Sequence, residues 1–403
     1  MADIWTETVE LTEEQRLVKR NIQELCADFD AEYWRERDAE GEYPHEFLEA
    51  LGEHGWLGIL IPEEYGGAGM ETTEAVVMME QIARQHGGGT AAQAIHGAVY
   101  NSRPIVRYGS ESLKEELLPK LATGEEAVQS LALTEPDAGS DSLAIDTFAE
   151  RDGDEYVING SKVWISRVNV TDYLLIIART TPAEEAEKRT RGISMFLADV
   201  DEAREAGTLE MEAIPKTVVP ATPSYELWFE DLRVPEEHLI GEEGNGFYQL
   251  LDGLNEERLV VAAENVGLGE LALDRAVDYA NQREVFDRLI GSNQAIQHPL
   301  AKAYAHVQAA KQTVYNAAPI VDEVESSDRR GGALANMAKF LSAEACYEAA
   351  DAAVQTHGGF GVAREYDVER YLREARFLRI APVAQELTLN YLGERVLGLP
   401  RSY

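Results

Sequence analysis

The sequence predicts an α+β protein that is mostly helical, with a small antiparallel sheet domain between helical ones. Apolar residues recur at helical spacing early in the chain, the period changes to two near Gly124, and long amphipathic stretches return after Gly246. A chain of 403 residues is also too long for one hydrophobic core. We therefore expect three domains: helical over 1–123, β over 124–243 and a helical bundle over 244–403.

The N-terminal segment has the pattern of a helical domain. Thr12 and Gln15 are spaced as a capping box. Apolar residues then recur at helical spacing: Val18, Ile22, Leu25 and Phe29. Further helices are expected over 44–55, 71–86, 90–108 and 110–121. The three glycines at 87–89 are interpreted as a flexible turn between helices and not as a phosphate loop.

The middle segment alternates as strands do. Residues 156–158 and 163–165 are β-rich, and Asn159-Gly160 between them is a type I′ hairpin signal. Further strands are expected over 173–179, 192–200 and 226–230, with a charged surface loop over 184–191. The C-terminal stretches 246–282, 293–322, 331–357 and 363–397 have lengths that favour a helix bundle, with a linker over 325–332.

Charge is the unusual property of the composition. Lys and Arg number 36 against 73 Asp and Glu, a formal net charge of −37. Such a field repels nucleic acid and anionic membranes. Spread along the whole chain, it predicts a surface adapted to a very salty cytoplasm; an ordinary acidic protein is the alternative. Only Cys26 and Cys346 occur, which indicates a reducing compartment.

Several familiar site patterns are absent from the sequence. There is no GxGxxG after a strand, no Walker A motif, no HExxH and no zinc spacing of Cys and His. These absences argue against a Rossmann nicotinamide enzyme, a P-loop NTPase and a zinc hydrolase. The histidines at 45, 54, 86 and 96 form no ligand pattern and are interpreted as structural. No apolar run is long enough for a bilayer span and no signal peptide pattern opens the chain, so we expect a cytoplasmic location without membrane insertion.

One loop has the composition of a ligand-binding turn. Residues 131–141 place small and hydroxyl residues around Pro136 and Gly139. Such a loop offers backbone N–H groups and the hydroxyls of Thr134 and Ser140 to a polar ligand. By itself this pattern fits a plain turn equally well.

Other blocks strengthen the ligand-binding interpretation of this loop. They are residues 58–67, residues 156–166 ending in Trp164-Ile165-Ser166, Arg283-Glu-Val-Phe286 followed by Gln294, and residues 355–361. Taken with the loop, and in this order, they resemble the acyl-CoA dehydrogenase family over nearly the whole chain. The resemblance implies an N-terminal helical domain, a middle β domain and a C-terminal four-helix bundle. It also implies FAD held between domains and neighbouring subunits, and a homotetramer.

The resemblance also assigns cofactor residues. Those implied to hold FAD are Leu131, Leu133, Thr134, Gly139, Ser140, Trp164, Ile165, Ser166 and, less firmly matched, Glu386. Those implied to hold the FAD of a neighbouring subunit are Arg283, Phe286, Gln294, Gln355, Gly358 and Gly359. An arginine fork on a pyrophosphate is physically sensible. Taken singly, Arg283 also fits a surface ion pair, Phe286 core packing and the glycine pair a helix cap.

The catalytic base departs from the common family pattern. Many members carry a glutamate where this chain has Pro382, which has no carboxylate and no backbone N–H for the thioester oxygen. A second family location matches Glu257. Periodicity supports it independently, because it shares a helical stripe with Leu250, Leu254 and Val261 while Glu256 points away. A carboxylate on a buried stripe has a raised pKa, as a base needs. The alternative is a Glu257–arginine pair on a wet helix edge.

The resemblance then implies substrate and reaction. Arg258 and Asn255 match positions that bind CoA, and the resemblance also implies that Ser140 contacts its pantetheine part. The implied activity oxidises a saturated acyl-CoA to the trans-2-enoyl-CoA and passes electrons to an electron-transfer flavoprotein. The alternatives are a flavin monooxygenase or oxidase of the same fold, and a non-catalytic partner subunit of a hetero-oligomeric dehydrogenase. Chain length and branching of the acyl group stay open.

Overall fold

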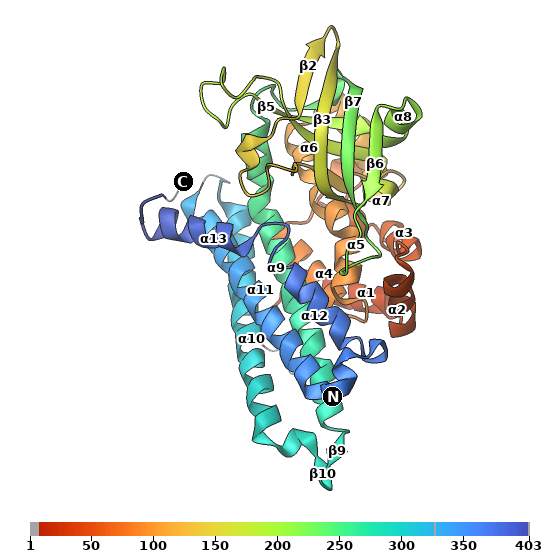
Figure 1. Cartoon of the computed structure of the whole chain (residues 1–403), viewed down its shortest axis with the longest axis vertical. Helices are drawn as coiled ribbons and strands as arrows, with labels where there is room; N and C mark the ends of the chain where they lie inside the picture. Colours follow the sequence, from red (N-terminus) through yellow and green to blue (C-terminus); the bar gives the residue numbers. More distant parts are fainter. Residues whose placement is uncertain (1–7, 326–327, 402–403) are drawn as a thin grey trace.

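A computed structural model describes residues 8–325 and 328–401 of the chain and has the predicted order of helices, sheet and helices. Figure 1 shows the sheet at one end of an elongated molecule, with the long helices of the C-terminal part running toward the other end. No helix in these two ranges is long and apolar enough to cross a membrane.

From residue 8 onward, the N-terminal part contains seven α-helices. They are α1 (Glu13–Cys26), α2 (Ala31–Glu40), α3 (His45–Glu53), α4 (Thr72–Arg84), α5 (Gly88–Tyr100), α6 (Ser102–Tyr108) and α7 (Glu111–Thr123). The capping box is confirmed, with the Gln15 amide donating to Thr12 Oγ1 over 3.2 Å and the Thr12 amide donating to Gln15 Oε1 over 3.1 Å. Helix α2 has no counterpart in the prediction, because its weak amphipathic pattern gives little periodic signal.

The three glycines predicted as a flexible turn form a turn only at Gly87, because Gly88 and Gly89 already belong to α5, and the segment is closely packed. A Cβ on Gly87 would lie 2.6 Å from the ring of Trp34. The buried carboxylate of Glu374 accepts the backbone N–H groups of Gly89 and Thr90 over 2.9 and 3.1 Å. Glycine is therefore required here by close approach, not by flexibility.

Helix α5 is pressed against the chain that enters the sheet. A Cβ on Gly97 would lie 2.0 Å from the backbone oxygen of Gln129, which cannot rotate away. We expect Gly97→Ala to lower the free energy of unfolding by about 3 kcal/mol, the upper range for overpacking. Gly253→Ala in α9 is the control, since nothing lies within 4 Å of its Cβ and a gain of up to about 1 kcal/mol is expected. Urea denaturation measures the stability of both variants, and equal unfolding midpoints for the two would contradict the prediction.

The middle part is one eight-stranded sheet, covered at one edge by the short helix α8 (Val200–Glu205). Its strands are β1 (Ser130–Ala132), β2 (Phe148–Asp152), β3 (Glu155–Ser166), β4 (Tyr173–Arg179), β5 (Ile193–Asp199), β6 (Leu209–Ala213), β7 (Ser224–Pro235) and β8 (Leu239–Ile240). The order is β6-β7-β3-β2-β4-β5-β8, with β1 beside β4. The sheet is mostly antiparallel as predicted, but β1 and β2 meet β4 in parallel because no hairpin joins them to it.

The hairpin predicted at Asn159-Gly160 is wrong. Strand β3 runs through both residues, and the tight turn lies earlier, at Gly153, where Asp152 pairs with Glu155. Gly160 instead sits at a bulge with φ 145°, where a Cβ would lie 2.7 Å from Thr147. The Asn-Gly signal marked a place that needs glycine, but the reason is a close approach within the sheet.

The C-terminal part is a bundle of long helices with a small hairpin. Its elements are α9 (Gly246–Ala280), β9 (Glu284–Val285), β10 (Arg288–Leu289), α10 (Gln294–Glu323), α11 (Arg329–His357), α12 (Val368–Phe377) and α13 (Gln385–Tyr391). The predicted single helix over 363–397 is broken at 378–384, a segment that contains Pro382. Part of the predicted linker, 326–327, lies outside the described residues.

Helix α9 joins the three parts. It packs on α4 and α5 of the N-terminal part, on α10, α11 and α12 of the bundle, and on β5 of the sheet. One large core is shared by the N-terminal helices and the bundle, while a separate core lies between the sheet, α7 and the beginning of α9. The first half of α9 therefore lies where the three parts meet.

Candidate active site

Glu257 lies at this junction. Its side chain is buried with 3% exposure and accepts a hydrogen bond from the hydroxyl of Tyr100 on α5. Burial raises the pKa of the Glu257 carboxyl, while the nearby His96 and Arg258 act in the opposite direction. The wet-edge alternative does not fit this burial. The role of Glu257 as the base stays a prediction.

Glu256 points away from Tyr100, as predicted, but it is not on a wet face. It is 4% exposed and receives Arg103 through Nε at 2.8 Å and Nη2 at 3.2 Å, together with Arg107. Two adjacent glutamates on α9 thus have opposite surroundings. Glu256 is ion-paired with two guanidinium groups, whereas Glu257 accepts a hydrogen bond from a neutral hydroxyl.

A second buried carboxylate lies two helical turns along α9. His96 Nδ1 is 2.5 Å from Glu264 Oε1, and Gln93 Nε2 donates to Glu264 Oε2 over 2.7 Å. Lys339 of α11 is close enough for its pKa to respond to both Glu264 and Glu257, and burial lowers that pKa to about 8. The sequence interpretation missed this group and treated His96 as structural. The available signal was the shared face of His96 and Tyr100 on one helix.

The end of β3 is tied to the same helix α5. Arg167 donates through Nη1 to the backbone oxygen of Gln93 over 2.7 Å and through Nε to that of Gln129 over 3.1 Å. Just before it, Trp164 is 57% exposed and has a left-handed φ of 63°, while Ile165 is buried. A bulky residue held in this conformation marks a constrained, outward-facing position.

Ser166, which follows Ile165, is fixed within the sheet. Its hydroxyl lies 2.8 Å from that of Ser224, and its backbone oxygen accepts the Ser130 hydroxyl over 2.7 Å. The strand that ends in Trp164, Ile165 and Ser166 is therefore anchored on both sides. Arg167 connects this strand end to α5, the helix that carries Tyr100.

The loop 131–141 is anchored at its base by a buried lysine. Lys162 has no exposed surface and donates to the backbone oxygen of Leu133 over 3.0 Å, to that of Ile177 over 2.7 Å and to Glu135 over 2.8 Å. The Thr134 oxygen accepts the Val163 amide over 2.9 Å. The sequence analysis did not single out Lys162, because its role depends on contacts with three separate strands and turns.

The tip of this loop is open. Gly139 and Ser140 are exposed, and no atom lies within 4 Å of a Cβ built on Gly139. Leu131, Leu133 and Thr134 are partly buried beneath them. A rigid base with an open tip leaves backbone groups accessible to a ligand.

The residues implied to reach a neighbouring subunit lie elsewhere. Arg283 and Phe286 are on the β9–β10 hairpin at the end of the molecule opposite the sheet (Figure 1). Phe286 is 91% exposed, so core packing is the wrong interpretation for it. Gln294, Gln355, Gly358 and Gly359 are exposed too, and Gly358 is the C-cap of α11. At this end the ring of Tyr279, just before the hairpin, stacks on the ring of His357, just before Gly358, with the two ring centroids 4.3 Å apart.

The remaining predicted site residues lie in two segments, one next to α13 and one on α9. Pro382 and Glu386 are exposed, at and just after the break before α13. Asn255 and Arg258 are on α9, where Arg258 Nη1 donates to Asn255 Oδ1 over 3.3 Å. The Nε of Arg258 is buried and makes no hydrogen bond within the described part of the chain.

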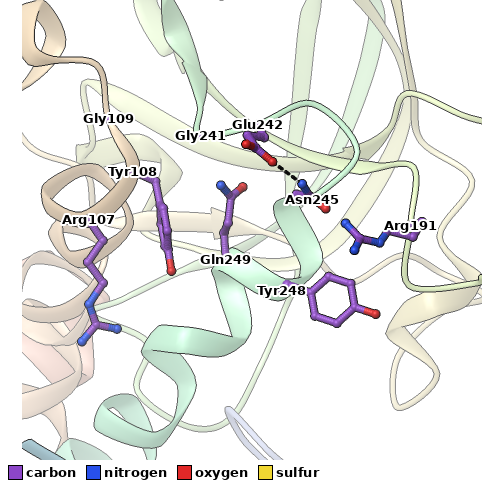
Figure 2. Close-up of a pocket in the computed structure, with 9 residues that line it drawn as sticks. All are labelled: Arg107, Tyr108, Gly109, Arg191, Gly241, Glu242, Asn245, Tyr248 and Gln249. Atoms are coloured by element: carbon purple, nitrogen blue, oxygen red, sulfur yellow. Dashed lines mark hydrogen bonds between the residues drawn. The ribbon is translucent and has the colours of Figure 1, made fainter. Parts of the chain in front are cut away.

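An open pocket of about 560 Å³ lies at the beginning of α9 (Figure 2). It is lined by Arg107, Tyr108, Gly109, Arg191, Gly241, Glu242, Asn245, Tyr248 and Gln249. Arg191 lies over the ring of Tyr248 with its guanidinium carbon 5.0 Å from the centroid, and Thr190 bonds the Tyr248 hydroxyl over 2.7 Å. Among the residues described, no group of His, Cys, Asp and Glu is arranged to hold a metal ion.

This arrangement of helices around a sheet, with a buried carboxylate at the junction, is shared by a class of oxidoreductases. Three models of that class match the chain: the acyl-CoA dehydrogenase N-terminal domain over 12–125, the middle domain over 130–232 and the C-terminal domain over 244–397. The chain belongs to the acyl-CoA dehydrogenase family, whose members are FAD-dependent.

Individual relatives agree with this assignment. The chain is 35% identical to the acyl-CoA dehydrogenase FadE12 of Mycobacterium tuberculosis, over 97% of this chain and 98% of the relative. It is 34% identical to the mitochondrial isovaleryl-CoA dehydrogenase of Pongo abelii, over 95% and 88%. A solved glutaryl-coenzyme A dehydrogenase with glutaryl-CoA superposes with a TM-score of 0.89 at 32% identity, covering 98% of each chain.

Proposed function

We propose that this protein is an FAD-dependent acyl-CoA dehydrogenase that converts a saturated acyl-CoA to the trans-2-enoyl-CoA. The observation that carries the proposal is Glu257, a buried carboxylate on α9 that is hydrogen-bonded by Tyr100 and adjacent to Arg258. The chain has no carboxylate at Pro382, so Glu257 is the residue placed to act as the base.

The described residues fit an FAD. The exposed, conformationally constrained Trp164 and the open loop at Gly139 offer a flat face and accessible backbone groups beside the junction. When bound, the flavin supplies an acceptor for the β-hydride of the acyl group. Leu131, Leu133, Thr134, Ser140, Ile165 and Ser166 are proposed to hold it, with Glu386 as a further, more distant contact.

Glu257 is proposed to remove the α-proton of the thioester. Removing a proton from so weak a carbon acid needs a carboxylate that is deprotonated yet poorly solvated. Burial makes Glu257 more basic, and the hydroxyl of Tyr100 stabilises its charged form. Because Pro382 lacks an N–H, the thioester oxygen must find its donors elsewhere.

The pocket at the beginning of α9 supports binding of CoA. Tyr248 precedes Glu257 by nine residues, which is about 13 Å along a helix, a span suited to an extended pantetheine arm. Arg191 presents a guanidinium group that makes no ion pair within the described part of the chain. In a protein with a net charge of −37, such a group beside an aromatic ring favours a phosphate-bearing ligand. Ser140, Asn255 and Arg258 are proposed to contact the arm between these points.

The far hairpin supports a homotetramer in which subunits share FAD sites. We expect Arg283→Ala to weaken FAD retention about tenfold, since a charge-assisted contact to a phosphate is worth roughly 1.5 kcal/mol or more. The fold of each subunit should be unchanged, because Arg283 is exposed. Flavin release on dilution measures this. Arg204→Ala on α8 is the control, and equal retention by both variants would count against a shared site.

The direct test is an anaerobic titration of the flavin-loaded protein with straight and branched acyl-CoAs. Bleaching of the flavin, with electrons then passing to an electron-transfer flavoprotein, is expected. Relatives named 3-(aryl)acrylate reductase and caffeyl-CoA reductase-Etf complex subunit make it useful to titrate reduced protein with enoyl-CoAs as well. Rapid reaction of the reduced flavin with oxygen would favour the alternative of a flavin monooxygenase or oxidase. A protein that carries no flavin, or a bound flavin that no thioester reduces, would favour the alternative of a non-catalytic partner subunit.

The pH dependence of flavin reduction should identify the base. The rate should rise with pH as Glu257 loses its proton, at a pH above the ordinary range of a glutamate, because burial raises its pKa. The titratable and charged groups near Glu257 are His96 on α5, Arg258 and Glu264 on α9, and Lys339 on α11. Tyr100 lowers this pKa through its hydrogen bond.

We therefore expect Tyr100→Phe to move the acidic limb of the rate profile to higher pH by about one unit, the equivalent of one hydrogen bond to a charged group. The contribution of Glu257 to the free energy of unfolding changes with pH in the opposite direction. A carboxylate with a raised pKa in the folded state binds extra protons there, so its contribution is lost as pH rises through that window. Tyr225→Phe in β7 is the control. If the acidic limb of the rate profile does not move in Tyr100→Phe, the group that acts as the base is not hydrogen-bonded by Tyr100.

A further inference from the structure

The hydroxyl of Ser166, which is proposed to hold FAD, is connected to a partly buried lysine. Lys216 Nζ lies 3.0 Å from Ser224 Oγ, which lies 2.8 Å from Ser166 Oγ. Lys216 also donates to the backbone oxygen of Thr222 over 2.6 Å. Side chains from the segment before β7, from β7 and from β3 therefore form one hydrogen-bonded chain that runs from an ammonium group to the strand end that carries Trp164.

The direction of the hydrogen bonds in this chain follows from the donors present. An ammonium group has three donors and no acceptor, so Lys216 donates to Ser224 Oγ. Ser224 is 4% exposed, and within the described part of the chain the one acceptor for its hydroxyl hydrogen is Ser166 Oγ. In the opposite order that buried hydrogen would stay unpaired, which costs stability. Ser224 therefore donates to Ser166.

The Ser166 hydroxyl then keeps a hydrogen that it can donate. Its oxygen accepts from Ser224, and its own hydrogen meets no acceptor among the residues that the structure describes. Ser166 is only partly buried, two residues after the exposed Trp164. A ligand bound at this strand end can accept that hydrogen bond.

The charge behind Ser166 strengthens this arrangement. Lys216 makes no ion pair with any described residue, although the chain has 73 Asp and Glu. The charged group near it is Arg167, a second cation, which donates to the backbone oxygens of Gln93 and Gln129. A cation without a carboxylate partner polarises the hydroxyls in front of it, so the last hydrogen bond of the chain favours an acceptor that gains negative charge.

We propose that Lys216 is a positioning residue that acts through Ser224 to make Ser166 a hydrogen-bond donor to the bound flavin, and that it thereby raises the reduction potential of the flavin. The proposal rests on the proposed function, because it assumes that FAD lies beside Ser166. Reduction adds electron density to the flavin ring. A donor of fixed direction therefore stabilises the reduced form more than the oxidised form.

The test measures the midpoint potential of FAD in the purified protein, without acyl-CoA. Lys216→Met should lower the ratio of reduced to oxidised flavin at a fixed ambient potential about tenfold, which corresponds to a midpoint about 30 mV lower. Lys216→Arg keeps the charge and the donors and should restore most of the wild-type value. Lys120→Met on α7 is the matched control, since it removes the same charge from a lysine that is paired with Glu126.

A double-mutant cycle tests the route through Ser224. Ser224→Ala leaves Lys216 bonded to Thr222 but removes the middle of the chain, so it should lower the midpoint potential as much as Lys216→Met does. The double variant should lower it no further, because both changes interrupt the same chain. If Lys216→Met does not fold, Ser224→Ala decides.

The pH dependence of the potential is a second readout. Burial and the nearby Arg167 lower the pKa of Lys216 from 10.5 to about 8. Below that pH the ammonium group fixes the direction of the chain, whereas the neutral amine above it can accept as well as donate. The difference in midpoint potential between the wild type and Lys216→Met should therefore be largest near neutral pH and shrink as the pH rises above about 8.

Two results would overturn the proposal. Equal midpoint potentials in the wild type, Lys216→Met and Ser224→Ala are expected if a water accepts from Ser166, and additive effects of the two changes are expected if Lys216 does not act through Ser224. If acyl-CoAs still bleach the flavin in either case, only the role of Lys216 is wrong. If the potentials shift as expected but no acyl-CoA reduces the flavin, only the dehydrogenase assignment is wrong. A protein that binds no FAD would overturn both.

Discussion

Glu257→Gln should reduce the rate of flavin reduction by acyl-CoA about a thousandfold, within the range for loss of a general base. Glutamine has nearly the same shape and can still accept the hydrogen bond of Tyr100 through its amide oxygen. It cannot take a proton. Because the change also removes a buried charge, the variant should be at least as stable as the wild type. Rapid mixing with substrate under anaerobic conditions measures the rate.

Glu256→Gln is the matched control, one residue away on the same helix. Glu256 is bonded by Arg103 and Arg107, so its replacement weakens two ion pairs and should cost about 2 kcal/mol of stability. Flavin reduction in the folded variant should stay within a few-fold of the wild type. The two variants thus separate chemistry from stability. The assignment of Glu257 is wrong if its glutamine variant still bleaches the flavin at near the wild-type rate.

The contrast between these neighbours shows what local sequence can predict. The spacing of Leu250, Leu254 and Val261 placed Glu257 on the buried stripe of α9, because helical periodicity is a local property. Other local patterns predicted the helix start at Thr12, from its capping box, and the strand over 173–179. It could not show that Glu256 is buried too, since that burial depends on arginines from α6.

Features that depend on distant contacts were misread or missed. Gly160 was taken for a hairpin turn, whereas the glycine is needed because Thr147 lies against it from the adjacent strand. His96 carried no ligand spacing within the sequence, and its partner Glu264 follows 168 residues later. Phe286 was compatible with a core position until the structure placed it 91% exposed. In each case the deciding information is which segments meet, and a single sequence does not contain it directly.

Lys162→Met is expected to lower the free energy of unfolding by about 3 kcal/mol, because it leaves the buried carboxylate of Glu135 without its cation. The backbone oxygens of Leu133 and Ile177 lose their donor as well. Since Leu133 belongs to the proposed flavin loop, FAD should also be retained more weakly. Urea denaturation of the flavin-free protein separates the first effect from the second, and Lys188→Met in an exposed loop should change neither.

The pH dependence gives this prediction a specific signature. Burial lowers the pKa of Lys162 from 10.5 to about 8. Between these values the unfolded chain holds a proton that the folded chain has released, so raising the pH stabilises the wild type there. Lys162→Met has no such group, and the stability gap between the two proteins should therefore widen from pH 8 toward 10.5. A gap that is constant with pH would show that Lys162 does not have a lowered pKa in the folded chain, and a variant as stable as the wild type would show that Lys162 does not anchor the loop.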